Sequence, residues 1–250
     1  MDVSEHVRQL RSDGERFSSS LARADLEATV PTCPDWTVRD LTVHLGSVHR
    51  WATAYVRDGL DVPDADLQTT AGPLPSDADL LGWFGDGVET LASALRDAPD
   101  DLSCWTFLEA PSARAFWARR QAHETAIHRV DLEGSVGSVG TFPPAFAADG
   151  IDELLFGFLG RPGRAPKVTA PVTFRLEAED ALRTWTVGLT TERFDLGSDV
   201  PLDHADAIVR GTASDLYLLM WNRGRSDGLE VCGDASALDA WASSVAVRWN

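Results

Sequence analysis

The stretch RRQAHETAIHRVD, residues 119–131, decides how the chain is interpreted, because it places acidic and basic side chains at helical spacing. Glu124 and His128 are four residues apart, so on a helix they share one face and can hold one ion between them. The stretch lies in a helix predicted between Pro111 and Glu133, which the glycine-rich residues 134–140 end. We therefore predict that this helix carries two ligands of a metal site.

The spacing resembles the zinc-protease motif HExxH, but one extra residue separates the two histidines. At about 100° per residue, His123 and His128 point about 140° apart and cannot be paired ligands. We therefore interpret Glu124 as a ligand and not as a general base. Two ligands from one helix do not complete a site, so a third must come from another helix.

The segment HLGSVHRW, residues 44–51, offers the third ligand. His44 lies three residues after Leu41 and four before Val48, on the apolar stripe that faces inward. His49 is five residues from His44, so at most one of these two histidines can point directly along that inward face. Two histidines and one carboxylate leave a coordination position open, as in catalytic zinc sites. His44, Glu124 and His128 are therefore the predicted metal ligands.

The same residues also allow interpretations without a metal. A single buried histidine is more often a hydrogen-bonded core residue than a ligand, which applies to His44. Glu124 and His128 could instead form a hydrogen bond that stabilises their helix. Asp131 is placed to orient His128 from one turn away, as ligating histidines usually require. We expect the arginines at 119, 120 and 129 to lie on a solvated face, and the tryptophans at 36, 51, 83 and 117 to be core anchors.

The first 160 residues have the pattern of a helical bundle, with apolar residues recurring at helical spacing. Thr37, with Asp40 three residues on, is the expected N-cap of the second helix. Four long helices joined by loops indicate a bundle. The helices are predicted over 2–27, 38–57, from Ser76 to the residue before Pro99, and 111–133, with a loop over 58–75 and a shorter helix after Pro144.

The composition changes at GRPGRAP, residues 160–166, which has the character of a linker. Beyond it, alternating apolar residues predict strands. We therefore predict an α+β chain of two domains, a helical bundle over 1–160 and a small α+β domain over 161–250. The second domain is predicted to contain strands at 172–178, 184–189, 192–196, 207–211 and 229–233, a helix capped by Ser214, and a closing helix over 235–247.

Charge and cysteine content exclude several classes of partner. The formal net charge is −17, so nucleic acid and anionic membrane surfaces would be repelled, and an anionic substrate needs a local cluster of arginines. Cys33, Cys104 and Cys232 give neither a disulfide framework nor a CxxC metal motif, which indicates a reducing compartment. The N-terminal residues lack the apolar region of a secretory signal, and no stretch approaches the roughly 20 apolar residues of a membrane span. We therefore expect a cytoplasmic protein.

Four stretches resemble the mycothiol-dependent maleylpyruvate isomerase family: VPTCPDWTVRDLTVHLGSVHRWA (30–52), AHETAIHRVDLE (122–133), IVRGTASDLYLLMWNR (208–223) and LEVCGDASALDAW (229–241). The resemblance implies a DinB-like four-helix bundle followed by a smaller domain like sterol carrier proteins. It places the family's zinc ligands on His44, Glu124 and His128, and an arginine that reaches toward the active site on Arg223. Asp35 departs from the family, which commonly has glycine there, and this affects only the turn before the second helix.

These observations and the resemblance together predict a zinc-dependent enzyme, with another divalent metal as the alternative ion. Its cofactor or co-substrate would be a low-molecular-weight thiol, mycothiol by resemblance, and its substrate a small electrophile. Release of the adduct would make the enzyme a thiol S-transferase, and expulsion of the thiol after bond rotation a cis–trans isomerase of the maleylpyruvate type. The alternatives are a metal-dependent hydrolase that activates water at the same residues, and a non-catalytic metal-binding protein.

Overall fold

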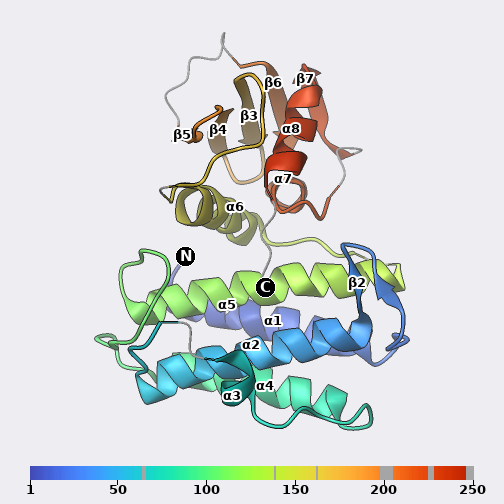
Figure 1. The fold of residues 1–250 in the computed structure, drawn as a ribbon, viewed down its shortest axis with the longest axis vertical. Coiled ribbons are helices and arrows are strands. Elements are labelled where there is room, and N and C mark those ends of the chain that lie inside the picture. The colour runs from blue at the N-terminus through green and yellow to red at the C-terminus, as the bar shows by residue number, and fades with distance from the viewer. Residues whose placement is uncertain (64–65, 138, 162, 198–204, 225–227, 246–250) are drawn as a thin grey trace. The chain divides into compact units, whose positions relative to one another are not determined.

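A computed structural model describes residues 1–63, 66–137, 139–161, 163–197, 205–224 and 228–245. The chain divides into two compact units, Met1–Gly140 and Thr141–Asn250. The first unit is mainly helical and the second combines a sheet with helices, so the predicted α+β class is confirmed (Figure 1). Within the described residues, no helix has both the length and the apolar composition needed to cross a bilayer.

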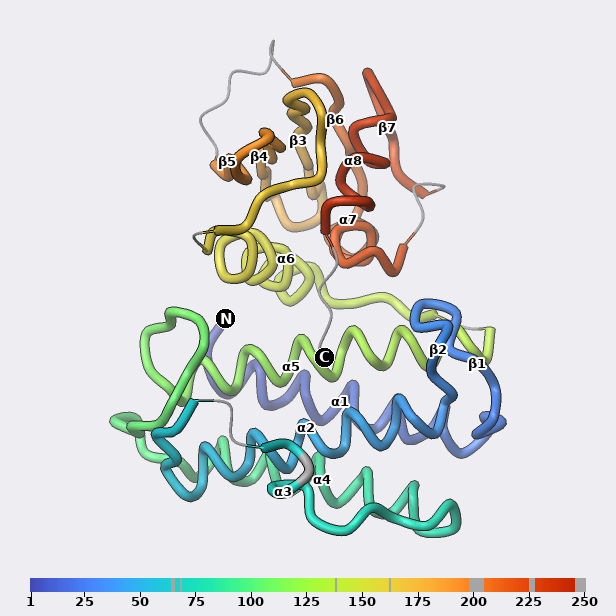
Figure 2. Tube along the Cα trace, in the orientation of Figure 1, coloured from blue at the N-terminus to red at the C-terminus, as the bar shows by residue number. Residues whose placement is uncertain are grey.

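Four long helices of the first unit, α1, α2, α4 and α5, pack against one another along their lengths (Figure 2). Their apolar faces meet in a core where the rings of Phe17 and Phe84 stack at a centroid distance of 4.3 Å. Gly46 lets α2 and α4 approach closely, because an added Cβ would lie 2.1 Å from the Trp83 ring. The elements of this unit are α1 (Val3–Leu21), β1 (Thr29–Val30), β2 (Cys33–Thr37), α2 (Val38–Asp58), α3 (Leu67–Ala71, inside the predicted loop), α4 (Leu80–Asp97) and α5 (Ala113–Val136).

A capping box sets where the second predicted helix begins, and a turn precedes the third. Thr37 and Asp40 form a reciprocal capping box at the start of α2, which confirms the predicted N-cap. The predicted start of the third helix is wrong, because α4 begins only at Leu80. The hydroxyl of Ser76 donates to the Asp79 carboxylate at 2.6 Å, and the Asp79 N–H donates to the Ser76 carbonyl in a turn. This turn occupies the residues that were expected to form the first helical turn.

The first helix is shorter than predicted and ends at Leu21. The carbonyls of Leu26 and Ala28 accept hydrogen bonds from the backbone N–H groups of Arg39 and Val38. Residues that follow α1 are therefore used to satisfy the start of α2, where four backbone donors have no partner inside the helix. Their apolar side chains extend the helical pattern in the sequence, although the backbone has left the helix.

The helix α5 is buried on nearly all sides over most of its length. Every residue from 116 to 133 is buried except Arg119. Arg120 is 1% and Arg129 0% exposed, which corrects the expectation that these two arginines lie on a solvated face. The sequence pattern could not show this burial, because polar and apolar residues are spread around α5 and no single apolar face stands out.

A network of charges connects α5 to α1. The Arg129 guanidinium places Nε 2.9 Å from Asp13 Oδ1 and Nη1 2.5 Å from Glu133 Oε2. Arg16 Nη2 lies 3.0 Å from the other carboxylate oxygen of Glu133. Because a buried charge is tolerated only when it is paired, these contacts fix the two helices against each other.

The second unit is built on a sheet with the strand order β5-β4-β3-β6-β7. Neighbouring strands are antiparallel except β3 and β6, which are parallel. In the hairpin of β3 and β4, Val172 pairs with Leu189 and Ala178 with Arg183. The elements are α6 (Pro144–Asp152), the π-helix η1 (Glu153–Leu159), β3 (Val172–Ala178), β4 (Arg183–Leu189), β5 (Phe194–Gly197), β6 (Ala207–Gly211), α7 (Ala213–Met220), β7 (Glu230–Gly233) and α8 (Ser236–Ser244).

The core of this unit lies between the sheet and its helices. The Trp241 ring on α8 meets the Phe174 ring edge-on at 5.7 Å, and its indole N–H donates to the Met220 carbonyl at 3.1 Å. All predicted strands are present, with bounds shifted by one or two residues. Residues 246 and 247 of the predicted closing helix lie outside the described residues.

The helix after Pro144 belongs to the second unit, so the units divide at 140/141 and not at the predicted 160/161. The Trp221 indole N–H donates to the Gly150 carbonyl at 3.3 Å, and the Trp185 indole N–H donates to Asp152 at 2.7 Å. These contacts hold α6 to α7 and to the sheet. The glycine- and proline-rich stretch at 160–166 is therefore a connection inside the second unit.

A different residue caps α7 than the sequence predicted. The Thr212 hydroxyl accepts from the Asp215 N–H at 3.1 Å and is the N-cap. Ser214, the predicted cap, lies in the first turn and accepts from the Phe142 N–H at 3.0 Å. Its hydroxyl therefore holds the segment before α6 against α7.

We expect Arg129→Met to lower the free energy of unfolding by about 3–5 kcal/mol, because it leaves Asp13 and Glu133 buried without this partner. Urea denaturation followed by helical circular dichroism measures the change. Arg57→Met is the matched control, since the Arg57 side chain is 64% exposed and its loss should cost within about 0.5 kcal/mol. Equal losses in the two variants would contradict a structural role for the network.

Candidate metal centre

Three predicted ligands come together between α2 and α5. His44 projects from α2, and Glu124 and His128 project from successive turns of α5. Glu124 Oε1 lies 3.2 Å from His128 Nε2 and 3.8 Å from His44 Nε2. The candidate ligand atoms all lie within 4.8 Å of one another.

The environment of His44 fits a metal ligand. Its Nε2 atom is buried and has no hydrogen-bond partner. A buried polar atom without a hydrogen-bond partner is uncommon and costly, so this nitrogen fits the role of a metal ligand. Two ligand atoms on one tetrahedral zinc ion lie about 3.3 Å apart, close to the distances of Glu124 Oε1 from His44 and His128. The donor set and its spacing therefore fit a divalent metal such as zinc.

Glu124 is held as an ionised carboxylate although it is buried. Burial alone would raise the pKa of Glu124, but the hydrogen bond with His128 and the nearby His44 ring outweigh it and hold the pKa well below its usual range. Arg120 Nη2 donates to Oε2 at 3.0 Å, which leaves Oε1 as the oxygen nearest both histidines. Arg120 thus compensates the carboxylate charge from the side away from the histidines.

The predicted contact between Asp131 and His128 is confirmed. His128 Nδ1 lies 2.9 Å from Asp131 Oδ2, and Asp131 Oδ1 accepts a hydrogen bond from the Thr32 hydroxyl at 2.5 Å. Burial would lower the pKa of His128, but the hydrogen bonds with Asp131 and Glu124 dominate and raise the pKa to about 9. Asp131 therefore fixes the ring so that Nε2 points to Glu124.

His49 is near this centre but bonded elsewhere. Its Nε2 lies 2.8 Å from the Thr125 hydroxyl, which itself donates to the Gln121 carbonyl at 2.8 Å. The hydroxyl hydrogen is thus already used, so His49 must be the donor at Nε2. Burial, with the nearby charge of Arg50, lowers the pKa of His49 to about 3, and burial also lowers the pKa of His44.

Two side chains near the centre were not predicted as site residues. Thr32 contacts Asp131, and the half-buried Trp36 ring lies 4.8 Å from the His44 ring. Trp36 was expected only to anchor the core. Both lie in the motif over 30–52, but a turn residue and a tryptophan carry no metal-binding spacing of their own. Their position therefore became visible only in the folded chain.

Arg223, the predicted active-site arginine, belongs to the second unit, where it follows α7. It is half-buried, and its Nη1 donates to the Trp221 carbonyl at 3.0 Å. Cys33 and Cys104 are half-buried and Cys232 is exposed, and none of the three forms a disulfide.

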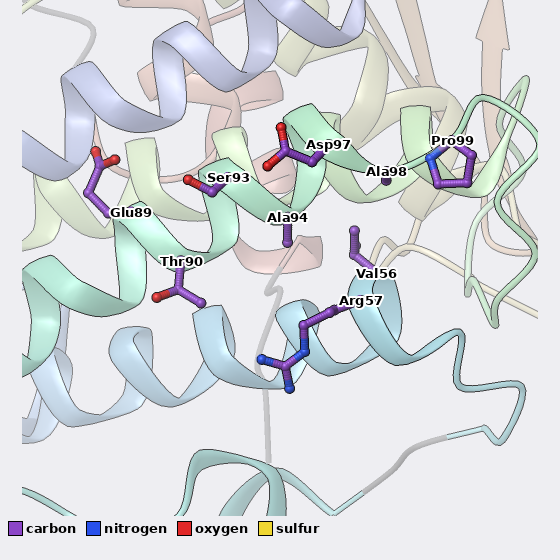
Figure 3. Close-up of a pocket in the computed structure, with 9 residues that line it drawn as sticks. All are labelled: Val56, Arg57, Glu89, Thr90, Ser93, Ala94, Asp97, Ala98 and Pro99. Atoms are coloured by element: carbon purple, nitrogen blue, oxygen red, sulfur yellow. The ribbon is translucent and has the colours of Figure 1, made fainter.

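A surface hollow of about 620 Å³ lies between α2 and α4 (Figure 3). Arg57 lines it from α2, and Glu89 and Asp97 line it from α4. None of the three candidate metal ligands is among its lining residues. The hollow is therefore separate from the candidate metal centre.

Comparison with known proteins gives matches over both units. Residues 7–133 match the family described as mycothiol maleylpyruvate isomerase N-terminal domain, and residues 145–240 match the corresponding C-terminal domain. A crystal structure of the mycothiol-dependent maleylpyruvate isomerase shares the fold, with a TM-score of 0.60 and 16% identity over 92% of this chain and 93% of that one. A histidine-to-alanine mutant of that enzyme matches over the same shares at a TM-score of 0.61 and 16% identity. No curated protein matches the chain.

In the metal-free protein, we expect His49 and His128 to titrate far apart, with pKa values of about 3 and about 9. At neutral pH, His49 then carries a hydrogen only on Nε2, while His128 carries one on each ring nitrogen. A pH titration of the imidazole nitrogen shifts by NMR measures both. Overlapping titrations near the ordinary value of about 6.5 would contradict the hydrogen-bond assignments.

Proposed function

Because the chain belongs to the mycothiol maleylpyruvate isomerase family, we propose that it is a zinc-dependent enzyme that uses a low-molecular-weight thiol to attack a small electrophile. The thiol we propose is mycothiol, as the family description indicates. The observation that carries the proposal is the buried cluster of His44, Glu124 and His128, in which His44 Nε2 has no hydrogen-bond partner.

The three clustered residues would hold the ion and leave a position open for an external ligand. A bound zinc ion would lower the pKa of a coordinated thiol toward neutrality. Arg120 pairs with the Glu124 carboxylate at Oε2, and Asp131 holds His128 with Nε2 directed at the cluster. These contacts prepare the ligand atoms before any metal binds, which favours a defined site.

We propose an electrophile with a carbon–carbon double bond conjugated to a carbonyl. The thiolate sulfur bonds to one alkene carbon, and the electron pair of the double bond moves toward the carbonyl. Rotation about the resulting single bond followed by loss of the thiolate restores the alkene in the other geometry, which is cis–trans isomerisation. Protonation of the adduct carbon instead yields a stable conjugate, which is S-transfer.

The sulfur nucleophile is proposed to be external to the chain. Burial raises the pKa of the Cys104 thiol, which disfavours its thiolate. Neither Cys33 nor Cys104 is part of the candidate ligand cluster. Arg223 is proposed to bind a substrate carboxylate, because a guanidinium can grip a carboxylate with two hydrogen bonds in a chain whose net charge of −17 repels anions.

Purified protein should contain about one divalent ion per chain, most of it zinc, when measured by elemental analysis. Replacing both His44 and His128 by alanine should remove the ion and keep the helical signal, because the bundle core does not depend on these side chains. Glu124→Gln should also lose most of the metal. Glu89→Gln is its control, since Glu89 is 59% exposed and outside the cluster. Full occupancy in the double variant would refute the ligand assignment.

Turnover of an activated alkene should require added mycothiol or a close mimic, and should stop when a chelator removes the metal. Activity should survive Cys33→Ser and Cys104→Ser, because the nucleophile comes from outside the chain. Recovery of the thiol after turnover distinguishes isomerisation, which returns it, from S-transfer, which consumes it. Product chromatography with a thiol assay measures both.

Two further arms of this assay test the remaining parts of the proposal. Arg223→Lys keeps the charge but loses the two-pronged guanidinium, so it should raise the Michaelis constant for a carboxylate-bearing substrate. Wild-type kinetics in Arg223→Ala would show that this residue does not bind the substrate.

Metal-dependent hydrolysis of an ester or amide without thiol would favour the activated-water alternative and end the thiol proposal.

A further inference from the structure

We propose that the hairpin of β1 and β2 is a supporting layer of the metal centre, with Thr32 and Trp36 as positioning residues for two different histidines. The inference rests on the proposed function and extends it to residues outside the ligand cluster. Its basis is that one short hairpin contacts both sides of the centre: the Asp131 side through a hydrogen bond and the His44 side through a ring contact.

Thr32 lies in the tight turn of this hairpin, since Val30 pairs with Cys33. Its hydroxyl donates to one oxygen of Asp131, and the other oxygen accepts from His128 Nδ1. A carboxylate held at one oxygen can still rotate about its Cβ–Cγ bond, whereas one held at both cannot. Thr32 therefore contributes to fixing the plane of Asp131, and with it the direction in which His128 presents Nε2.

Trp36 acts on the other histidine. Its ring lies 4.8 Å from the His44 ring at an interplanar angle of 56°. The next residue, Thr37, is the N-cap of α2, and His44 follows it by two helical turns. The strand that carries Trp36 therefore leads directly into the helix that carries His44. This connection holds the Trp36 ring against the His44 imidazole and restricts the rotation of the imidazole.

The hairpin is anchored well enough to serve this purpose. Val30 is 0% exposed and belongs to the same hydrophobic cluster as Leu132, the neighbour of Asp131 on α5. At the other end, the Val38 N–H donates to the Ala28 carbonyl at 2.9 Å. The position of the turn relative to α5 is therefore set by core packing and by backbone hydrogen bonds, independently of the Thr32 hydroxyl.

The test compares Thr32→Val with Thr32→Ser and with Thr29→Val, which alters an exposed threonine of the same hairpin. Each full-length protein is loaded with Co²⁺ in place of zinc. Affinity is measured by competition with a chelator, and ligand geometry by the visible absorption of the bound cobalt. We expect Thr32→Val to weaken metal binding about 10-fold or more and to change the cobalt spectrum, as losses of outer contacts to metal ligands do. Thr32→Ser should restore both, and Thr29→Val should match the wild type.

The second part of the test measures metal affinity and the cobalt spectrum in Trp36→Leu, with Trp36→Phe as the conservative variant. Wild-type affinity and spectrum in Thr32→Val would overturn the inference while leaving the proposed function intact. Loss of helical circular dichroism in Thr32→Val would also overturn it, since the hydroxyl would then support the fold and not the centre. Absence of cobalt binding by the wild type would refute the proposed function itself, and this inference with it.

Discussion

In the first unit, most of the charged side chains of α5 are buried, and each buried charge must be matched inside the bundle because water cannot solvate it. Arg129 is matched by carboxylates from α1 and α5, and Arg120 by Glu124. These pairings determine which helices can lie beside α5 and at what register. The candidate metal centre follows the same rule with one difference: the pairing around His44 is incomplete, because its buried Nε2 has no partner. An ion would complete it, so the charge pairs and the proposed metal site both use polar residues of α5 together with partners from a neighbouring helix.

Helical spacing was sufficient to predict which residues meet at the centre. Glu124 and His128 share a face whatever surrounds them, and the apolar neighbours of His44 gave its direction. The α+β class was predictable for a similar reason, since periods of 3.6 and 2 distinguish helices from strands directly. The structure brings the three residues together, and their role as metal ligands stays a prediction. Arg223 could be assigned only by resemblance, because no local pattern connects it to residues far away in the sequence.

What the sequence could not predict depends on contacts between distant segments. Arg120 and Arg129 look like surface residues in any local pattern, and only the charges opposite them allow their burial. The boundary between the units was misplaced because glycine and proline mark a bend in the chain, whereas the packing of α6 on α7 defines the unit. Thr32 was missed because its partner, Asp131, lies far along the sequence.

The hydrogen bond between His49 and Thr125 has a consequence for metal selectivity. A neutral imidazole beside two histidines and a carboxylate would offer a third nitrogen donor, and a nitrogen-rich site is one that copper and nickel also occupy readily. Thr125 prevents this at Nε2, because its hydroxyl, committed to the Gln121 carbonyl, holds the Nε2–H of His49 as a donor. The ring nitrogen that points to α5 is thereby protonated and cannot bind a cation. The basic nitrogen of the His49 ring is therefore Nδ1, and the proposed ligand set of His44, Glu124 and His128 does not include His49.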